Sequence, residues 1–329
     1  MPLSDSEPTI DVLGIGNALV DVIAAASPQL VESLGLVAGS MNLIEHERRV
    51  EIYEQMGPGH ETSGGSAANT MAALASFGAT GHYFGRVRDD QLGEVFAHDI
   101  RKIGVGFTNP AASEGPATGC CLVLVTPDAE RTMNTFLGAA ALFGVSDVDP
   151  DVVRESRFLY MEGYLFDRDE AKEAYTFAAS TARQAGRKVA LSLSDSFCVD
   201  RHRDAFIDLC ESAVDVVFAN ESELLALTGE SNIDAGLRAI GGLCEHAVVT
   251  RGEHGATTML RGQRIDTPAV PVAQLVDTTG AGDMFAAGYL FGLTRSADVA
   301  TCSGWGAAAA SEVISHYGPR PEISLSALL

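Results

Sequence analysis

Residues 276–292, VDTTGAGDMFAAGYLFG, combine a glycine-rich turn with a carboxylate and an apolar run. Gly280 and Gly282 flank Ala281, and Asp283 stands directly before the apolar residues. The pattern predicts a turn that leads into the N-terminus of a buried helix. Glycine lets a backbone approach a ligand closely, and the free N–H groups of a first helical turn bind anions such as phosphate. Asp283 could accept a proton from a hydroxyl that attacks the phosphate, or it could simply cap a core helix.

The segment DTTGAGDMF, residues 277–285, resembles the C-terminal signature of the ribokinase-like (PfkB-type) family of sugar and nucleoside kinases. The resemblance implies that Gly280, Ala281 and Gly282 form an anion hole for the transferred phosphate and that Asp283 is the catalytic base. It extends over most of the chain, from about Asp11 to Pro321. The implied fold is a three-layer α/β/α sandwich with a mainly parallel central sheet, formed as one domain by residues 1–329. A small β-sheet lid is expected from segments within 15–24, 38–46 and 115–136.

Two glycine-containing segments in the first third of the chain are candidates for the acceptor site. IDVLGIG predicts a strand over residues 10–16, and TSGGSAANTMAALASFG predicts a Gly-Gly turn before an amphipathic helix. The family resemblance implies that the hydroxyls of the substrate are bound by Asn17, Asp21, Gly64, Gly65 and Asn69. Turn residues, a surface aspartate and a polar residue early in a helix are the alternative readings of the same positions.

Strands and helices alternate through the second half of the chain. Strands are predicted over 158–161, 189–193, 215–219 and 247–250, with a helix over 170–185 that Gly186 closes. Such alternation predicts a parallel sheet covered on both faces, with ligands bound beyond the carboxyl ends of its strands. The residues expected at that edge are Asn220, Glu223, Thr250, Gly252 and Asp283.

The resemblance also implies where a nucleotide and metal ions bind. Asn220 and Glu223 are expected to organise Mg²⁺ and the ATP phosphates, Glu223 through water, because Mg²⁺ keeps several of its waters. The remaining ATP contacts are expected from Thr250, Gly252, Gly255 and, beside the adenine, Trp305, although a single tryptophan also suits a core. Asp277, Thr279 and Gly318 match positions that hold a monovalent cation such as K⁺.

The expected reaction is ATP-dependent phosphorylation of the primary (5′) hydroxyl of a nucleoside, with adenosine as first candidate and a role in purine salvage. GNALVD and residues 27–44 resemble adenosine kinases, and the predicted hairpin of 120–126 and 131–136 offers apolar surface for a base. Phe136 could stack on that base or fill the core. The alternative is a sugar kinase of the same family acting on ribose, fructose or 2-keto-3-deoxygluconate, in which Glu162 could bind a sugar hydroxyl.

Composition excludes several other classes of protein. The formal net charge is −22, which argues against nonspecific binding to nucleic acid. No apolar run reaches the length of a membrane span, and the acidic N-terminus does not resemble a signal peptide. The six cysteines are scattered, which predicts reduced thiols in a cytoplasmic protein. We expect the protein to be a monomer or a homodimer.

Two other functions compete with the kinase. Gly14-x-Gly16 invites a dinucleotide-binding oxidoreductase, but Leu19 stands where the third glycine of that fingerprint belongs. A catalytically silent binding protein is disfavoured because Asp283 and the glycines of the turn are both present. No G-K-[ST] phosphate-binding sequence occurs in the chain.

Overall fold

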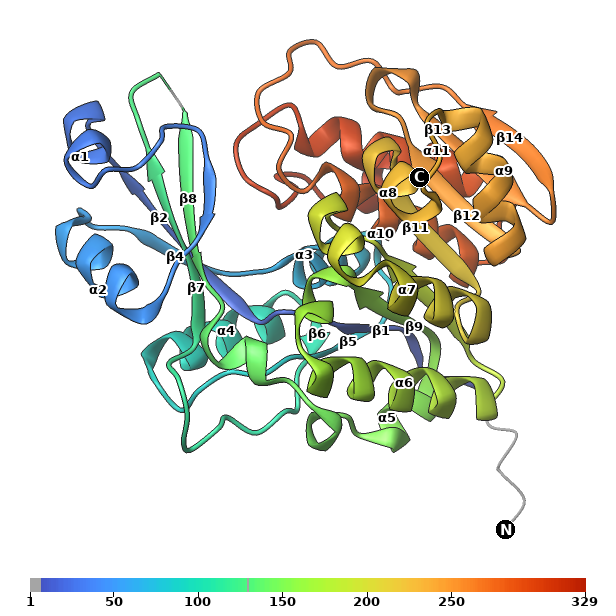
Figure 1. Cartoon of the computed structure of the whole chain (residues 1–329), viewed down its shortest axis with the longest axis horizontal. Coiled ribbons are helices and arrows are strands. Elements are labelled where there is room, and N and C mark those ends of the chain that lie inside the picture. Colours follow the sequence, from blue (N-terminus) through green and yellow to red (C-terminus); the bar gives the residue numbers. More distant parts are fainter. Residues whose placement is uncertain (1–6, 129) are drawn as a thin grey trace.

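The main sheet has nine strands in the order β14-β13-β12-β11-β10-β9-β1-β5-β6 (Figure 1). The computed structural model describes residues 7–128 and 130–329, so the expected loose tail at 1–8 lies almost entirely outside the described residues. Strands from β12 to β6 pair in parallel, whereas β13 pairs antiparallel with both β12 and β14. The strands are β1 Ile10–Ile15, β5 Gly81–Phe84, β6 Val105–Gly106, β9 Ser156–Glu162, β10 Lys188–Ser192, β11 Val216–Asn220, β12 His246–Thr250, β13 Ala256–Leu260 and β14 Gln263–Thr267.

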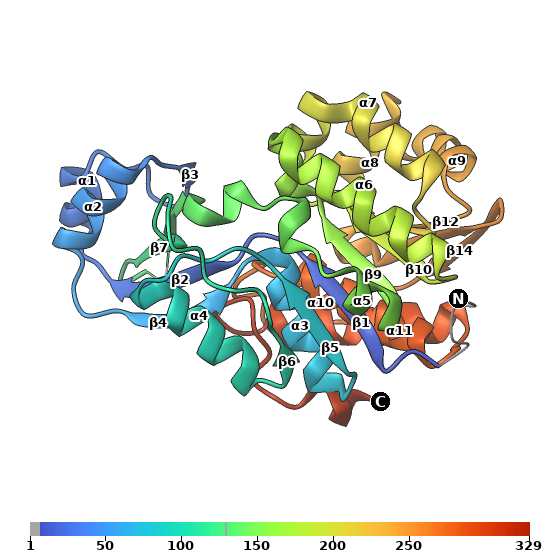
Figure 2. The same ribbon diagram turned by 90° about the horizontal axis from the view of Figure 1, so that it is seen from below.

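Helices cover both faces of this sheet, as Figure 2 shows from below. One face packs against α3 (Ser66–Phe77), α10 (Ala281–Thr294) and α11 (Val299–Val313), with α4 (Gln91–Lys102) beside them. The other face packs against α5 (Pro150–Glu155), α6 (Asp169–Gln184), α7 (Ser196–Ser212), α8 (Glu221–Thr228) and α9 (Ile233–Leu243). Two hydrophobic cores result, one on each side of the sheet. No helix in the described ranges is long and apolar enough to cross a membrane.

A second sheet of five strands stands beside the main body and forms a lid (Figure 1). Its order is β3-β8-β7-β2-β4, from β2 (Leu19–Ala25), β3 (Met41–Leu43), β4 (His60–Gly64), β7 (Gly119–Val125) and β8 (Arg131–Phe136). Two helices, α1 (Pro28–Ser33) and α2 (His46–Gln55), belong to the same region. All three segments expected to form the lid contribute strands, and β4 adds one that the sequence did not predict.

The local sequence explains why the elements near the lid begin where they do. Gly65 ends β4 with a φ of 100°, and a Cβ there would lie 2.2 Å from the carbonyl oxygen of Asn17. Only glycine allows this approach, so α3 starts directly above the connection from β1 to β2. Asn220 caps α8 in a capping box: its side chain accepts from the N–H of Glu223, and Glu223 accepts from the N–H of Asn220. Both devices bring helix N-termini to the carboxyl edge of the main sheet.

Candidate active site

A cavity of about 860 Å³ lies between the carboxyl edge of the main sheet and the lid. The strands β1, β9, β10, β11 and β12 contribute residues at or directly after their carboxyl ends. Residues of the main body line one side of the cavity, and residues of the lid line its other side. The predicted site residues that line the cavity are Asn17, Asp21, Gly65, Asn69, Glu162, Asn220, Glu223, Thr250, Thr279, Gly280, Ala281, Gly282 and Asp283. The structure therefore places most of the predicted site residues, from distant parts of the chain, in one cavity.

Asp283 lies in the first turn of α10 and is held by two side chains of α3. Ser66 donates its hydroxyl to Oδ1 at 2.6 Å, and Asn69 donates Nδ2 to Oδ2 at 3.3 Å. Burial raises the pKa of Asp283 to about 7, against the lowering effect of these two hydrogen bonds. A carboxylate with a pKa near neutrality can accept a proton from an alcohol and release it again at physiological pH. The sequence did not single out Ser66, although it directly follows the Gly-Gly pair.

The glycine-rich turn ahead of Asp283 leaves backbone amides free. Gly280 caps α10 in the left-handed region, with a φ of 80°, and a Cβ there would lie 2.8 Å from Pro319. Among the described residues, the N–H groups of Gly282 and Asp283 donate to no backbone acceptor. These amides and the positive end of the helix dipole can bind an anion beside the Asp283 carboxylate.

The predicted hydroxyl-binding residues surround the same carboxylate. Asp21 lies on β2, where it pairs with Thr62 of β4, and a Cβ on Gly64 would come within 2.6 Å of the Asp21 carboxyl group. Burial raises the pKa of Asp21 to about 6, while Arg320 and Arg131 lower it. Asn17 is buried, and its Oδ1 has no partner among the described residues, so this oxygen can accept a hydrogen bond from a ligand.

Glu162 is fully buried, and its carboxylate serves the fold. Oε1 accepts from the backbone N–H of Asn17 at 2.6 Å and from Asn17 Nδ2 at 2.8 Å, and Oε2 accepts from the N–H of Ala67 at 2.7 Å. The side chain thus ties the end of β9 to the connection after β1 and to the start of α3. Glu162 also lines the cavity, so its binding of a sugar hydroxyl stays a prediction, although three protein donors already occupy its oxygens.

The predicted nucleotide residues divide into two groups. Asn220, Glu223 and Thr250 line the cavity, and burial raises the pKa of Glu223 to about 7. Gly252 and Gly255 lie in the turn after β12, outside the lining of the cavity. Trp305 is also outside it. Its ring packs 5.5 Å from that of Phe291, between α10 and α11, and its contact with the adenine stays a prediction.

Phe136 lies on the face of the lid that points away from the cavity. Side chains alternate along β8, so Met133 and Thr135 line the cavity while Phe136 points to the opposite face, 5.7 Å from the ring of His46. The structure therefore assigns Phe136 to the core of the lid. Four aromatic residues line the cavity: Phe218 and Phe285 are buried, whereas Tyr164 and Phe197, which the sequence did not single out, are exposed by 38% and 72%.

Asp277 is fully engaged by protein donors. Oδ1 accepts from the N–H and the hydroxyl of Thr279, and Oδ2 accepts from the N–H of Gly318 at 3.1 Å and from Arg131 Nη1 at 2.9 Å. Burial alone raises the pKa of Asp277, but these contacts together hold it below its usual value. The ion pair joins the lid strand β8 to the turn that precedes the free amides.

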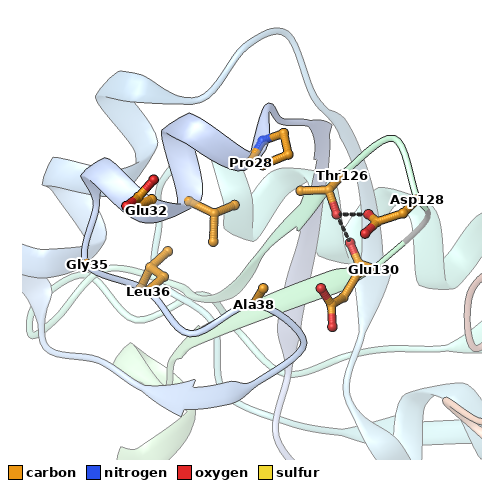
Figure 3. A pocket seen from close by; sticks show the side chains of 9 residues that line it. Pro28, Glu32, Gly35, Leu36, Ala38, Thr126, Asp128 and Glu130 are labelled. Carbon is orange, nitrogen blue, oxygen red and sulfur yellow. Dashed lines mark hydrogen bonds between the residues drawn. The ribbon is translucent and has the colours of Figure 1, made fainter.

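A second cavity, of about 420 Å³, lies within the lid region (Figure 3). It is bounded by α1, by the segment after it and by the β7–β8 hairpin, where the Thr126 hydroxyl donates to Asp128 and to the carbonyl of Glu130. Its rim is acidic, with Glu32, Asp128 and Glu130. None of the predicted site residues lines it.

Comparison with known proteins decides the family. The model of the pfkB family of carbohydrate kinases matches residues 28–325. The chain belongs to the pfkB family. The structure of adenosine kinase from Sinorhizobium meliloti is 46% identical, with a TM-score of 0.89 over 97% of this chain and 98% of that one. A probable sugar kinase protein from Rhizobium etli CFN 42 is 44% identical, with a TM-score of 0.90 over 98% of each chain.

Curated pfkB relatives include kinases of both substrate classes. Adenosine kinase of Saccharomyces cerevisiae is 26% identical over 94% of this chain and 96% of its own length, and kinases of sugars also match, among them fructokinase of Escherichia coli. Membership confirms the ribokinase-like fold expected from the sequence. It also identifies the protein as an ATP-dependent kinase that acts on a hydroxyl group.

Proposed function

We propose that this pfkB kinase phosphorylates the 5′ hydroxyl of a nucleoside, with adenosine as the first candidate. The observation that carries the proposal is the two-sided character of the large cavity. Its polar part offers Asn17 and Asn69 from the main body and Asp21 from the lid strand β2 to hydroxyl groups. Its lid side has an apolar wall, formed by Leu19, Met41, Leu43, Val123, Met133 and Leu137, beside the polar lid residues Asp21, Arg131 and Thr135. A nucleoside has the same division between a polar ribose and a flat base.

Aromatic residues at the other wall strengthen the case for a base. Tyr164 and Phe197 line the cavity with much of their rings exposed. Stacking a base on an aromatic side chain contributes about 1–3 kcal/mol, and a free sugar lacks the broad π-face of a base. The adenosine kinase from S. meliloti, at 46% identity, adds support from a relative.

The chemistry then follows from the positions around Asp283. Asp283 accepts the proton of the 5′ hydroxyl as its oxygen bonds to the γ-phosphorus of ATP, while the bond from that phosphorus to the bridging oxygen breaks and ADP leaves. The free amides of Gly282 and Asp283 stabilise the negative charge on the transferred group. Such a transfer depends mainly on positioning and electrostatics, so no covalent intermediate is required.

Glu223 is our candidate for the Mg²⁺ that accompanies ATP. Its carboxylate lines the cavity at the N-terminus of α8, already oriented by the backbone and side chain of Asn220. Asp195, which caps α7, lines the same wall. One carboxylate acting through water is enough for Mg²⁺ that also binds phosphates, so these residues fit the ion.

Among the residues expected to hold K⁺, the Asp277 carboxylate does not suit a bound cation. Arg131 already supplies a positive charge 2.9 Å from Oδ2, and a second cation there would be repelled. We infer that Arg131 orders this turn in the place of a monovalent cation. Equal rates in K⁺ and in tetramethylammonium, at matched ionic strength, are expected; several-fold activation by K⁺ would contradict the inference.

A free sugar is the second candidate, favoured by the probable sugar kinase from R. etli at 44% identity. The discriminating experiment is kcat/KM for adenosine, other nucleosides, ribose, fructose and 2-keto-3-deoxygluconate with ATP and Mg²⁺. We expect adenosine to exceed every free sugar by at least tenfold. A free sugar tenfold better than adenosine would overturn the nucleoside proposal and leave the kinase assignment intact. We also keep the cytoplasm as the proposed location, since all six cysteines are buried and unpaired.

A further inference from the structure

Arg320 contacts the active site from the segment that follows α11. Its Nε donates to Asn69 Oδ1 at 2.8 Å, and its Nη2 donates to the carbonyl oxygen of Ser63 at 2.7 Å and to the Ser63 hydroxyl at 3.1 Å. Asn69 is the residue of α3 that donates to Asp283. Arg320 is therefore one side chain removed from the catalytic base. Neither the sequence motifs nor the mechanism above gives it a role.

The contact with Arg320 fixes which way the Asn69 amide faces. An arginine only donates hydrogen bonds and an ionised aspartate only accepts them. Oδ1 of Asn69 must therefore face Arg320, which leaves Nδ2 to face the carboxylate of Asp283, 3.3 Å away. Without Arg320, the amide is free to turn its oxygen toward Asp283, and that orientation would repel the carboxylate instead of donating to it.

A hydrogen-bonded network holds Arg320 itself in place. Asp99 on α4 accepts from the backbone N–H of Ser63 at 2.9 Å and from its hydroxyl at 2.6 Å, and from Thr62 at 3.2 Å. Ser63 in turn accepts from Arg320. The network joins α4, β4, α3 and the C-terminal segment, all of which meet behind the cavity.

Arg320 also places a positive charge among several acidic groups. Asp283 is faced by Glu162 and Tyr160 from β9, by Tyr164 from the turn after it and by Arg320. Burial and Glu162 raise the pKa of Asp283, whereas Arg320 lowers it. Burial lowers the pKa of Arg320 itself, but a guanidinium remains protonated in proteins.

We propose that Arg320 is a positioning residue for the phosphoryl transfer, which orients the Asn69 amide toward Asp283 and supplies the positive charge that balances the carboxylates of the acceptor site. It acts through Asn69 and does not touch the reacting atoms. This inference rests on the proposed role of Asp283 as base.

The test uses Arg320→Met and Arg320→Lys in the full chain, with kcat/KM for the best acceptor measured from pH 5 to 9 and Tm measured for each variant. Arg320→Met removes both the charge and the hydrogen bonds, so we expect kcat/KM to fall at least tenfold and its acid limb to move to higher pH. Arg320→Lys keeps the charge, but one ammonium cannot reproduce the planar fork that reaches both Asn69 and Ser63. We expect its acid limb to match wild type, with kcat/KM lowered at least fivefold.

Arg295→Met is the control, because Arg295 also pairs with a buried carboxylate, that of Asp11, but away from the cavity. We expect it to change Tm alone. If Arg320→Met fails to fold, the lysine variant decides the question. The proposal is overturned if a folded Arg320 variant keeps kcat/KM within twofold of wild type. Asp283→Asn, measured alongside, separates the two hypotheses. Full turnover in that variant means that the base assignment has failed. Loss of turnover in Asp283→Asn, with wild-type activity in the Arg320 variants, means that only the inference about Arg320 has failed.

Discussion

At the scale of single residues, Asp283 is poised by opposing effects. Burial raises its pKa to about 7, and the hydroxyl of Ser66, 2.6 Å from Oδ1, lowers it. Below neutral pH the carboxylate is protonated in the folded enzyme and cannot accept a proton. The acid limb of kcat/KM should therefore lie near pH 7.

Ser66→Ala tests this balance. A hydrogen bond to a charged group is worth about 1.5–3 kcal/mol, and about 1.4 kcal/mol corresponds to one pH unit, so we expect the acid limb to rise by about one to two units. Ser180→Ala, on the exposed side of α6, is the control and should leave the profile unchanged. An unchanged limb in Ser66→Ala would show that Asp283 is not the group that titrates.

Sequence reasoning succeeded for some residues and failed for others for a physical reason. The glycines and Asp283 are recognisable because glycine is needed where backbones approach, as at Gly65 and Gly280. The direction in which a side chain points is harder to predict from the sequence. Alternate residues of β8 point to opposite faces of the lid, so Phe136 points away from the cavity while its neighbours Thr135 and Leu137 line it. Arg320 could not be identified at all, because nothing local in its sequence indicates a contact with a residue 251 positions away.

At the scale of elements, the lid decides which acceptor fits. Leu43 is 62% exposed on β3, and with Met133 on β8 it lines the cavity, so a bound base would cover apolar surface that is now open to solvent. The alternation of strands and helices in the main sheet was predictable from the sequence, and so was the β7–β8 hairpin of the lid. The antiparallel β13 and β14 and the lid strand β4 were not predicted, because short strands with few apolar residues carry a weak periodic signal.

Truncating the lid wall should weaken acceptor binding selectively. For Leu43→Ala and Met133→Ala we expect the KM for adenosine to rise about five- to thirtyfold, from roughly 1–2 kcal/mol of lost apolar contact, with the KM for ATP unchanged. Val37→Ala is the control, since Val37 is 71% exposed but does not line the cavity. If the two wall variants alter the KM for ATP instead, this surface belongs to the nucleotide.

At the scale of the whole molecule, buried carboxylates and a net charge of −22 make stability depend on pH. Burial raises the pKa values of Glu162, Glu223 and Asp283 to about 7. The folded state therefore keeps protons that the unfolded chain releases near pH 4, so these groups lower stability as pH rises toward and through 7. His246, whose pKa burial lowers to about 4, acts in the opposite direction, but only below about pH 6.5.

We therefore expect Tm to be higher at pH 6.5 than at pH 8 by a few degrees, roughly the effect of 1 kcal/mol in a chain of this size. At pH 8, raising NaCl from 20 to 200 mM should increase Tm, because salt screens the repulsion among the excess acidic residues. Thermal unfolding at the two pH values and two salt concentrations checks both statements. A Tm that is higher at pH 8 than at pH 6.5 would mean that these carboxylates are ionised in the folded state at little cost.

The most direct test of the account is the turnover of Asp283→Asn with ATP, Mg²⁺ and the best acceptor. The amide is close in shape to the carboxylate and leaves the amides of the glycine turn in place, so the variant should fold and bind ATP with wild-type affinity. Loss of a general base costs roughly 10²–10⁴-fold, and we predict a fall in kcat within that range. A variant that retains more than about a tenth of the wild-type kcat would contradict the assignment of Asp283 as the base.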